Sequence, residues 1–116
     1  MTLNKVIEIL KAEVLVGSDA LQMEIKIGCG CDLMSDVLAF VKPETLLLTG
    51  LTNPQSVRTA EMSDIKTICF VRGKKPGRDT IELAKKSSIP LLLTPLPLFV
   101  ACGKLYNAGM IGSFEI

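Results

Sequence analysis

The chain has 116 residues, a length that fits one domain able to bury roughly two-thirds of its unfolded surface. Its 13 basic and 12 acidic residues nearly cancel, which argues against nucleic acid or an anionic membrane as a partner. Apolar residues make up 48% of the sequence, with no Trp and one Tyr. Because this content is high for a small domain, we expect an apolar surface for a homodimer or another protein subunit.

The location of the protein is predicted from its charges and cysteines. The amino-terminal stretch contains the charged residues Lys5, Glu8 and Lys11 in place of an unbroken apolar segment. It is therefore not expected to be a signal peptide. The most apolar segment, 89–102, is too short to span a bilayer and contains three prolines. Without an export signal, the four cysteines indicate free thiols in a reducing compartment. We therefore expect a soluble cytoplasmic protein.

The first third of the chain predicts one helix and two strands. Thr2 is placed to cap a helix over residues 3–10 with an apolar stripe, and residues 12–16 predict a short strand. Apolar and polar residues alternate over 21–27, which predicts a strand with one wet face near an edge of the sheet. Residues 28–32 then predict a loop.

The next elements alternate between helices and short apolar runs. Asp32 is a candidate cap for a helix that buries several residues: Leu33, Met34, Val37, Leu38 and Val41. A buried strand is predicted at 46–49, and Asn53 followed by Pro54 predicts the start of a helix containing Val57, Ala60 and Met62.

The last part of the chain continues the same alternation. Strands are predicted at 67–71 and 90–94, separated by a helix that Asp79 opens. A final helix is expected to end at Gly109 and to bury five residues: Leu98, Phe99, Cys102, Leu105 and Tyr106. We expect residues 112–116 to form a loose or edge-packed tail, and this tail could begin as early as residue 110.

This order of elements predicts the fold class. Runs that are apolar without a period of two suit strands buried on both faces, and their alternation with helices is typical of parallel βαβ units. We expect a single α/β domain over residues 1–116, with a mostly parallel sheet of about five strands and helices on both faces. In such a sheet the loops after the strands meet at one edge, where ligands bind.

Two of these loops predict an anion site. The loop 72–78 holds Arg72, Lys74, Lys75 and Arg78 together with Gly73, and cations beside a helix amino terminus favour phosphate or carboxylate. Thr94, at the end of the last predicted strand, offers a further donor. The junction before the basic loop offers four more: Thr49, Gly50, Thr52 and Asn53. The alternatives are a solvated turn for the basic loop and helix capping for Thr52 and Asn53. No phosphate-loop motif occurs.

The cysteines support a second hypothesis, a thiol-based redox or metal-binding protein. Cys29 and Cys31 lie between glycines near a predicted helix amino terminus, where thiol pKa values fall. Zinc prefers four ligands, however, and the chain has no His. A structural role is therefore favoured for both, and we predict no metal and no cofactor.

Catalysis finds little support in the sequence. Asp32 and Asp36 would share a helix face and suit acid–base chemistry or Mg²⁺, but capping explains them more simply. Without His or an evident nucleophile, the chain is not expected to be an enzyme.

Several strings along nearly the whole chain resemble the DRTGG domain, in its free-standing clostridial-type form. The residues that carry the resemblance are these: Gly30-Cys31-Asp32-Leu33-Met34-Ser35-Asp36-Val37, Arg72-Gly73-Lys74-Lys75-Pro76, Glu82-Leu83-Ala84, Ile89-Pro90-Leu91-Leu92, Thr94 and Gly103-Lys104-Leu105-Tyr106. The resemblance implies a regulatory or ligand-sensing module that pairs with itself or a neighbouring domain. It also implies a fold similar to the amino-terminal domain of HPr kinase/phosphorylase and to the amino-terminal DRTGG domains of phosphotransacetylases.

Together these observations predict a non-catalytic binding module. Its ligand would be a small anionic metabolite or a nucleotide at the rim of strand-to-helix loops. A protein-interaction module with no small ligand remains the further alternative.

Overall fold

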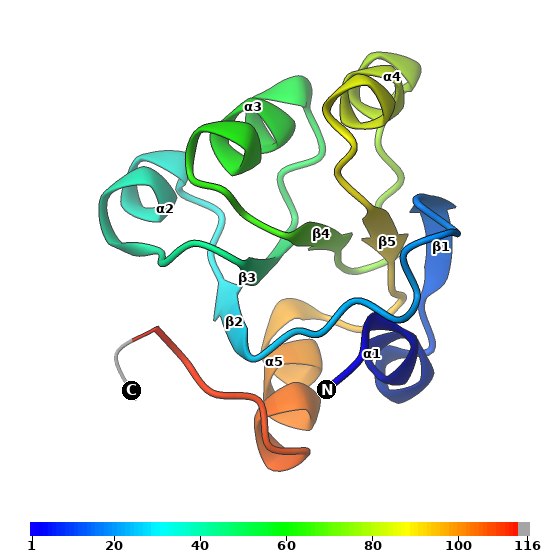
Figure 1. Cartoon of the computed structure of the whole chain (residues 1–116), viewed down its shortest axis with the longest axis vertical. Helices are drawn as coiled ribbons and strands as arrows, with labels where there is room; N and C mark the ends of the chain where they lie inside the picture. The colour runs from blue at the N-terminus through cyan, green and yellow to red at the C-terminus, as the bar shows by residue number, and fades with distance from the viewer. Residues whose placement is uncertain (114–116) are drawn as a thin grey trace.

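The computed structural model describes residues 1–113 (Figure 1), so residues 114–116 of the expected tail lie outside the described residues. The chain alternates helices and strands in the following order: α1 (Leu3–Leu10), β1 (Glu13–Val16), β2 (Ile27–Gly30), α2 (Met34–Phe40), β3 (Thr45–Thr49), α3 (Pro54–Met62), β4 (Thr67–Phe70), α4 (Arg78–Ser87), β5 (Leu91–Leu93) and α5 (Leu98–Asn107).

The five strands form one sheet in the order β1-β5-β4-β3-β2. Strands β2 to β5 are parallel, whereas β1 pairs antiparallel with β5 at one edge. The sheet is therefore mixed, and the predicted fold class, a mostly parallel sheet of about five strands, is confirmed.

Helices cover both faces of this sheet. Figure 1 shows α1 and α5 on one face and α2, α3 and α4 on the other. Alternate residues of one strand belong to opposite cores: Leu46 and Leu48 face α1 and α5, and Leu47 faces the other three helices. The central strands must therefore be apolar on both faces, which explains their unbroken apolar runs.

Three predicted helix boundaries are confirmed. The Thr2 hydroxyl accepts from Lys5 N at 3.2 Å, and the Asn53 side chain accepts from Gln55 N at 3.0 Å with Pro54 in the first helical position. Gly109, with a φ of 110°, follows the end of α5. These caps satisfy backbone groups that the helices leave unpaired.

The strand predicted over 21–27 is wrong in its extent, because β2 begins only at Ile27. The preceding residues pair with the start of α1 instead of with the sheet. Leu3 N donates to Met23 O at 2.8 Å, and Ile25 N donates to Met1 O at 2.7 Å. The predicted loop 28–32 is wrong for the same reason, since residues 28–30 form an edge strand against β3.

Helix starts and faces also differ from the prediction at several positions. Helix α2 begins after Leu33 rather than being capped by Asp32, and α4 begins after Gly77 rather than at Asp79. Several side chains predicted to be buried are exposed: Leu33, Leu38, Met62, Phe99 and Tyr106. A single sequence does not show that α2 and α5 lie near the β2 edge, where each helix keeps one side in solvent.

The parallel register brings the loops after β3 and β4 to one edge of the sheet. Thr49 of β3 lies beside Phe70 of β4, and Phe70 lies beside Leu93 of β5. Gly50 and Gly73 therefore lie at the same end of the molecule, as the sequence predicted. We call this end, formed by residues 31–33, 50–53, 71–77 and 94–97, the carboxyl rim.

No helix within residues 1–113 is long and apolar enough to cross a membrane.

Candidate functional site

The carboxyl rim contains the point where the connections of the sheet change sides. The chain leaves β4 toward α4 on one face of the sheet and leaves the adjacent β5 toward α5 on the other. Before they diverge, Arg72 N donates to Leu96 O at 2.8 Å and Gly73 N donates to Thr94 O at 2.9 Å. In open α/β sheets such a switch point is the usual place for a ligand.

Arg72 is held at this point by a tight turn. Both Arg72 and Gly73 have positive φ, 59° and 65°, and Lys74 N closes the turn on Val71 O at 3.2 Å. A left-handed conformation is costly for any residue except glycine, and such residues are concentrated at functional sites. The turn directs the guanidinium toward β3, where Nη2 lies 3.1 Å from the position of a Cβ added to Gly50.

Asp32 lies close to the same point, with both carboxylate oxygens 3.7 Å from the position of a Cβ added to Gly50. Its Oδ1 accepts from the Gly50 N–H at 2.7 Å and from the Thr49 hydroxyl at 2.9 Å. The predicted capping role of Asp32 is therefore wrong, because its carboxylate binds the end of β3. Two donors that the sequence assigned to an external anion are thus already bound to an internal one.

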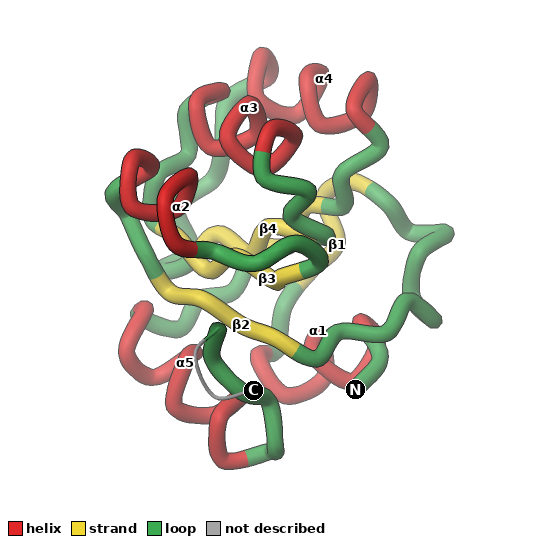
Figure 2. The backbone as a smooth tube through the Cα atoms, turned by 60° about the vertical axis from the view of Figure 1, so that its left-hand side comes forward, coloured by secondary structure: helices red, strands yellow, loops and turns green. Residues whose placement is uncertain are grey.

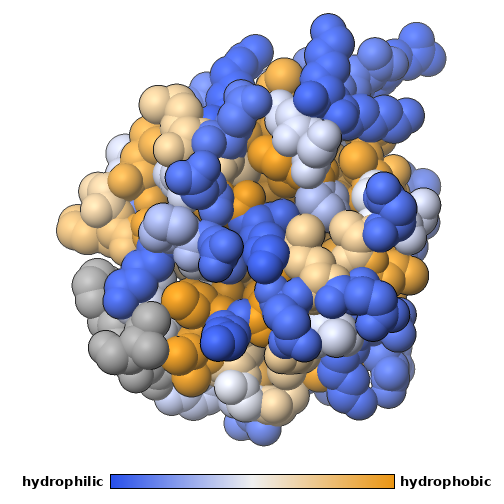
Figure 3. Space-filling model, in the orientation of Figure 1, coloured by the Kyte–Doolittle hydropathy of each residue, from blue (hydrophilic) through white to orange (hydrophobic). Residues whose placement is uncertain are grey.

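The other predicted cations spread along the rim. Lys74, Lys75 and Arg78 are exposed, and Lys75 lines a cleft of about 350 Å³ beside Lys11 and Glu13. Within residues 1–113, none of the four cations of the loop 72–78 has a carboxylate oxygen within 4.0 Å. Figure 3 shows other long hydrophilic side chains projecting over α4. The four cations of this loop therefore form no ion pair within the described residues, although Glu13 and Asp32 lie nearby.

Three predicted site residues have structural roles instead. Thr94 is fully buried and donates its hydroxyl to Leu10 O at 2.6 Å, so its side chain is not on the rim surface. The Thr52 carbonyl accepts from the Thr80 hydroxyl at 2.8 Å, which joins α4 to the loop between β3 and α3. The Asn53 side chain caps α3, as the alternative interpretation held.

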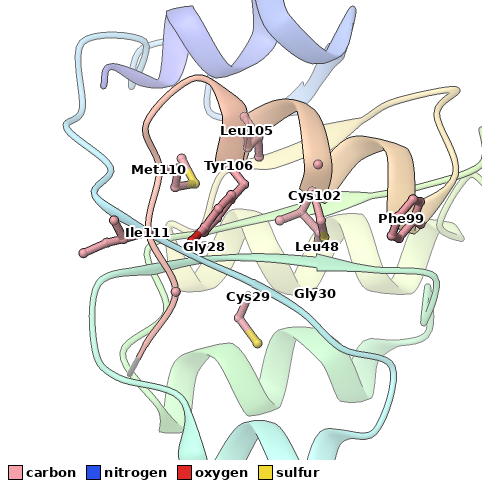
Figure 4. A pocket seen from close by; sticks show the side chains of 12 residues that line it. Gly28, Cys29, Gly30, Leu48, Phe99, Cys102, Leu105, Tyr106, Met110 and Ile111 are labelled. Carbon is pink, nitrogen blue, oxygen red and sulfur yellow. The ribbon is translucent and has the colours of Figure 1, made fainter. Parts of the chain in front are cut away.

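A pocket that the sequence did not predict lies between β2 and α5 (Figure 4). Its volume is about 330 Å³ and its lining is almost entirely apolar. Its walls include the following residues: Gly28, Cys29, Gly30, Leu48, Phe99, Cys102, Gly103, Leu105, Tyr106 and Met110. The signal that could have revealed the close packing here is the pair of glycines in β2.

These two glycines allow α5 and the segment after it to approach the edge strand. A Cβ on Gly30 would lie 2.5 Å from Cys102 Sγ, and one on Gly28 would lie 2.7 Å from Met110 Sδ. Figure 2 shows β2 running between α2 and α5, and Gly28 N donates to Ile111 O at 2.9 Å. Residues 110 and 111 therefore pack along the edge of the sheet.

The thiols have environments that oppose ionisation. Burial, with the nearby thiols of Cys31 and Cys102, raises the pKa of Cys29 to about 11. Burial and then Cys102 raise the pKa of Cys69 to about 12. Cys29 lies in a strand rather than at a helix amino terminus, so the pKa change is opposite to the one expected. No group of three or more His, Cys, Asp or Glu suited to a metal occurs in the described part of the chain.

Comparison with known proteins bears on the fold. No protein-family model matches the sequence, and no curated protein matches it. A solved structure that does match shows the CBS and DRTGG domains of the regulatory region of Clostridium perfringens pyrophosphatase, complexed with the activator diadenosine tetraphosphate. It superposes on 99% of this chain with a TM-score of 0.75 and 17% sequence identity. This chain has the fold of part of that regulatory region.

The extent of the match is also informative. The chain spans about half of the matched structure, 52% of its length. The α/β fold that the DRTGG resemblance implied is thereby supported, whereas the neighbour's ligand belongs to a larger protein. The free-standing form and the similarity to HPr kinase/phosphorylase stay predictions.

Proposed function

We propose that this protein is a non-catalytic regulatory module of the DRTGG type that binds a small phosphate-containing ligand at the carboxyl rim. Arg72 is its principal contact, with Lys74, Lys75 and Arg78 supplying further positive charge. Gly73, which is exposed, allows the ligand to approach the backbone next to Arg72.

The observation that carries this proposal is the position of Arg72. Arg72 is exposed, and its guanidinium has no carboxylate oxygen within 4.0 Å in residues 1–113 and lies over Gly50 beside the switch point of the sheet. A planar guanidinium binds phosphate through two parallel hydrogen bonds. The left-handed backbone of Arg72 costs folding free energy, and a ligand contact gives a reason for keeping arginine there.

The comparison structure supports the same class of function. The matched regulatory region is complexed with an activator that carries four phosphates between two adenosines. A module of the same fold that senses a phosphorylated ligand would fit this precedent. We extend the regulatory role to this chain by proposal, together with a cytoplasmic location.

A thermal-shift screen tests the proposal directly. Pyrophosphate, tripolyphosphate and nucleotides are added to the wild-type protein and to Arg72→Gly, with Lys26→Ala as a control. Lys26 is exposed and precedes β2, at the opposite end of the sheet from the rim. We expect polyphosphates to raise the melting temperature of the wild type and of Lys26→Ala, but not of Arg72→Gly. The absence of any shift in the wild type would contradict the proposal.

A partner surface is supported separately by helix α2. Leu33, Leu38 and Phe40 are 58%, 44% and 59% exposed, and all three lie on or beside this helix. Exposed apolar side chains on one short element favour a second copy or another subunit. Sedimentation of the wild type and of Leu38→Asp tests this prediction, with a monomeric wild type at high concentration as the contradicting result.

A further inference from the structure

We propose that the pocket between β2 and α5 holds the aromatic base of the same ligand whose phosphate lies at the rim, so that the ligand is a nucleotide. This inference rests on the proposed function and adds the chemical class of the ligand. It assigns a role to a pocket that lies outside the predicted anion site.

The chemistry of the pocket suits a flat aromatic ring. A volume of about 330 Å³ lies within the range of ligand sites. The side chains of Cys102 and Met110 cover Gly30 and Gly28 and form apolar walls, and Phe99 stands at one end of the pocket with 88% of its surface exposed (Figure 4). A phenylalanine left in solvent beside an apolar pocket offers a stacking surface.

The register of the sheet connects this pocket to the anion site. Gly30 pairs with Leu48, and both residues line the pocket. Asp32 and Gly50 each follow two residues later along the same two chains. Two residues of extended chain cover about 7 Å. The end of the pocket at Gly30 and Leu48 therefore lies about 7 Å from the backbone of Asp32 and Gly50, over which the Arg72 guanidinium lies, and a nucleoside can bridge this distance.

The contacts available also predict how the base is recognised. The lining offers few polar groups, so the base would be held by stacking and apolar contact rather than by hydrogen bonds to its edges. Stacking is tolerant of base identity because every base has a π-face. We expect ADP and GDP to bind with similar affinity, and both more tightly than pyrophosphate.

Gly103 provides a variant that blocks the pocket while keeping the fold. It lies within α5 and lines the pocket, and a Cβ there would meet no atom within 4 Å. Leucine is a much better helix former than glycine, so Gly103→Leu is expected to fold and to fill the cavity. Phe99→Ala removes the stacking surface, and Met62→Ala, an exposed apolar side chain on α3, is the matched control.

Titration calorimetry with ADP and pyrophosphate tests the inference. We expect the wild type and Met62→Ala to bind ADP about fivefold or more tighter than pyrophosphate, since stacking a base contributes about 1–3 kcal/mol. In Gly103→Leu and Phe99→Ala this advantage should disappear, while pyrophosphate affinity stays unchanged.

The outcomes separate this inference from the proposed function. If pyrophosphate binds through Arg72 but ADP binds no tighter, or if Gly103→Leu leaves ADP affinity unchanged, the nucleotide assignment is wrong and the anion site stands. If neither probe binds, both proposals fail. A change in sedimentation of Gly103→Leu without any change in ADP affinity would assign the pocket to a protein interface and overturn the inference.

Discussion

The carboxylate of Asp32 is bound to the backbone of Gly50, with 2.7 Å between Oδ1 and the amide nitrogen. The two residues are 18 positions apart and belong to the loops that follow β2 and β3. This contact joins the edge strand to the central sheet at the rim. It also places an acidic group near the Arg72 guanidinium, because the carboxylate oxygens of Asp32 and Nη2 of Arg72 lie 3.7 Å and 3.1 Å from the position of a Cβ added to Gly50.

Asp32→Ala should destabilise the fold. The Gly50 N–H is in a buried residue, and removal of its acceptor leaves a donor without a partner. Such a group costs about 1–3 kcal/mol, and we expect a loss of this size in the free energy of unfolding. Asp36→Ala is the control, because Asp36 is exposed on α2. Urea denaturation of both variants decides the matter, and equal stability would argue against the contact.

Arg72→Gly should separate folding from ligand binding. Glycine adopts a positive φ without the steric cost that arginine has at 59°. We therefore expect a free energy of unfolding that is equal to or up to about 1 kcal/mol above that of the wild type. A stable variant that has lost its response to pyrophosphate would be the expected combination. A strongly destabilised variant would mean that the arginine side chain supports the fold.

Gly30→Ala should disturb the packing of α5 on β2. The added Cβ would lie 2.5 Å from Cys102 Sγ and 3.3 Å from Leu98 Cδ1. Overpacking of this kind costs about 1–3 kcal/mol. Cys102→Ala in the same chain should recover part of the loss, because it removes the nearer atom. Thermal unfolding of the single and double variants measures this coupling, and strictly additive effects would contradict it.

The raised pKa values of the Cys29 and Cys69 thiols predict that the folded protein loses stability at alkaline pH. A folded-state pKa of about 11 for Cys29 and about 12 for Cys69, above their ordinary value of 9.0, means that the unfolded chain loses these protons first. Stability from the protonated thiols is therefore complete below pH 9 and falls as the pH rises through this window. Cys69→Ala should flatten the fall between pH 9 and 12 in denaturation curves, after allowance for its cavity. An unchanged slope would argue against a buried, protonated Cys69.

The sequence predicted the central strands and the parallel sheet because their signals are local. Leu46 to Leu48 form an unbroken apolar run, and Asn53-Pro54 specifies a helix start without tertiary context. The β2 edge was harder to predict, since a strand of sequence Ile-Gly-Cys-Gly has neither alternation nor strong β propensity. Its pairing is set by β3 and by residues 110–111.

The candidate site was predicted only in part. The basic loop and the Gly50 junction were found from composition, and their proximity followed from parallel topology. The Asp32 contact was missed because a carboxylate just before a helix reads as a cap in sequence. The pocket under α5 was missed because it depends on packing between residues about 70 positions apart, Gly30 and Cys102.

The central claim is that the carboxyl rim binds phosphate, and amide chemical-shift mapping tests it most directly. Pyrophosphate is titrated into the ¹⁵N-labelled protein at physiological salt, where weak surface attraction is screened. We predict saturable shifts confined to the amides of Gly50, Leu51, residues 72–75, Gly77 and Arg78. Shifts that do not saturate, or that appear at the opposite end of the sheet around Lys26 and Lys66, would contradict the account.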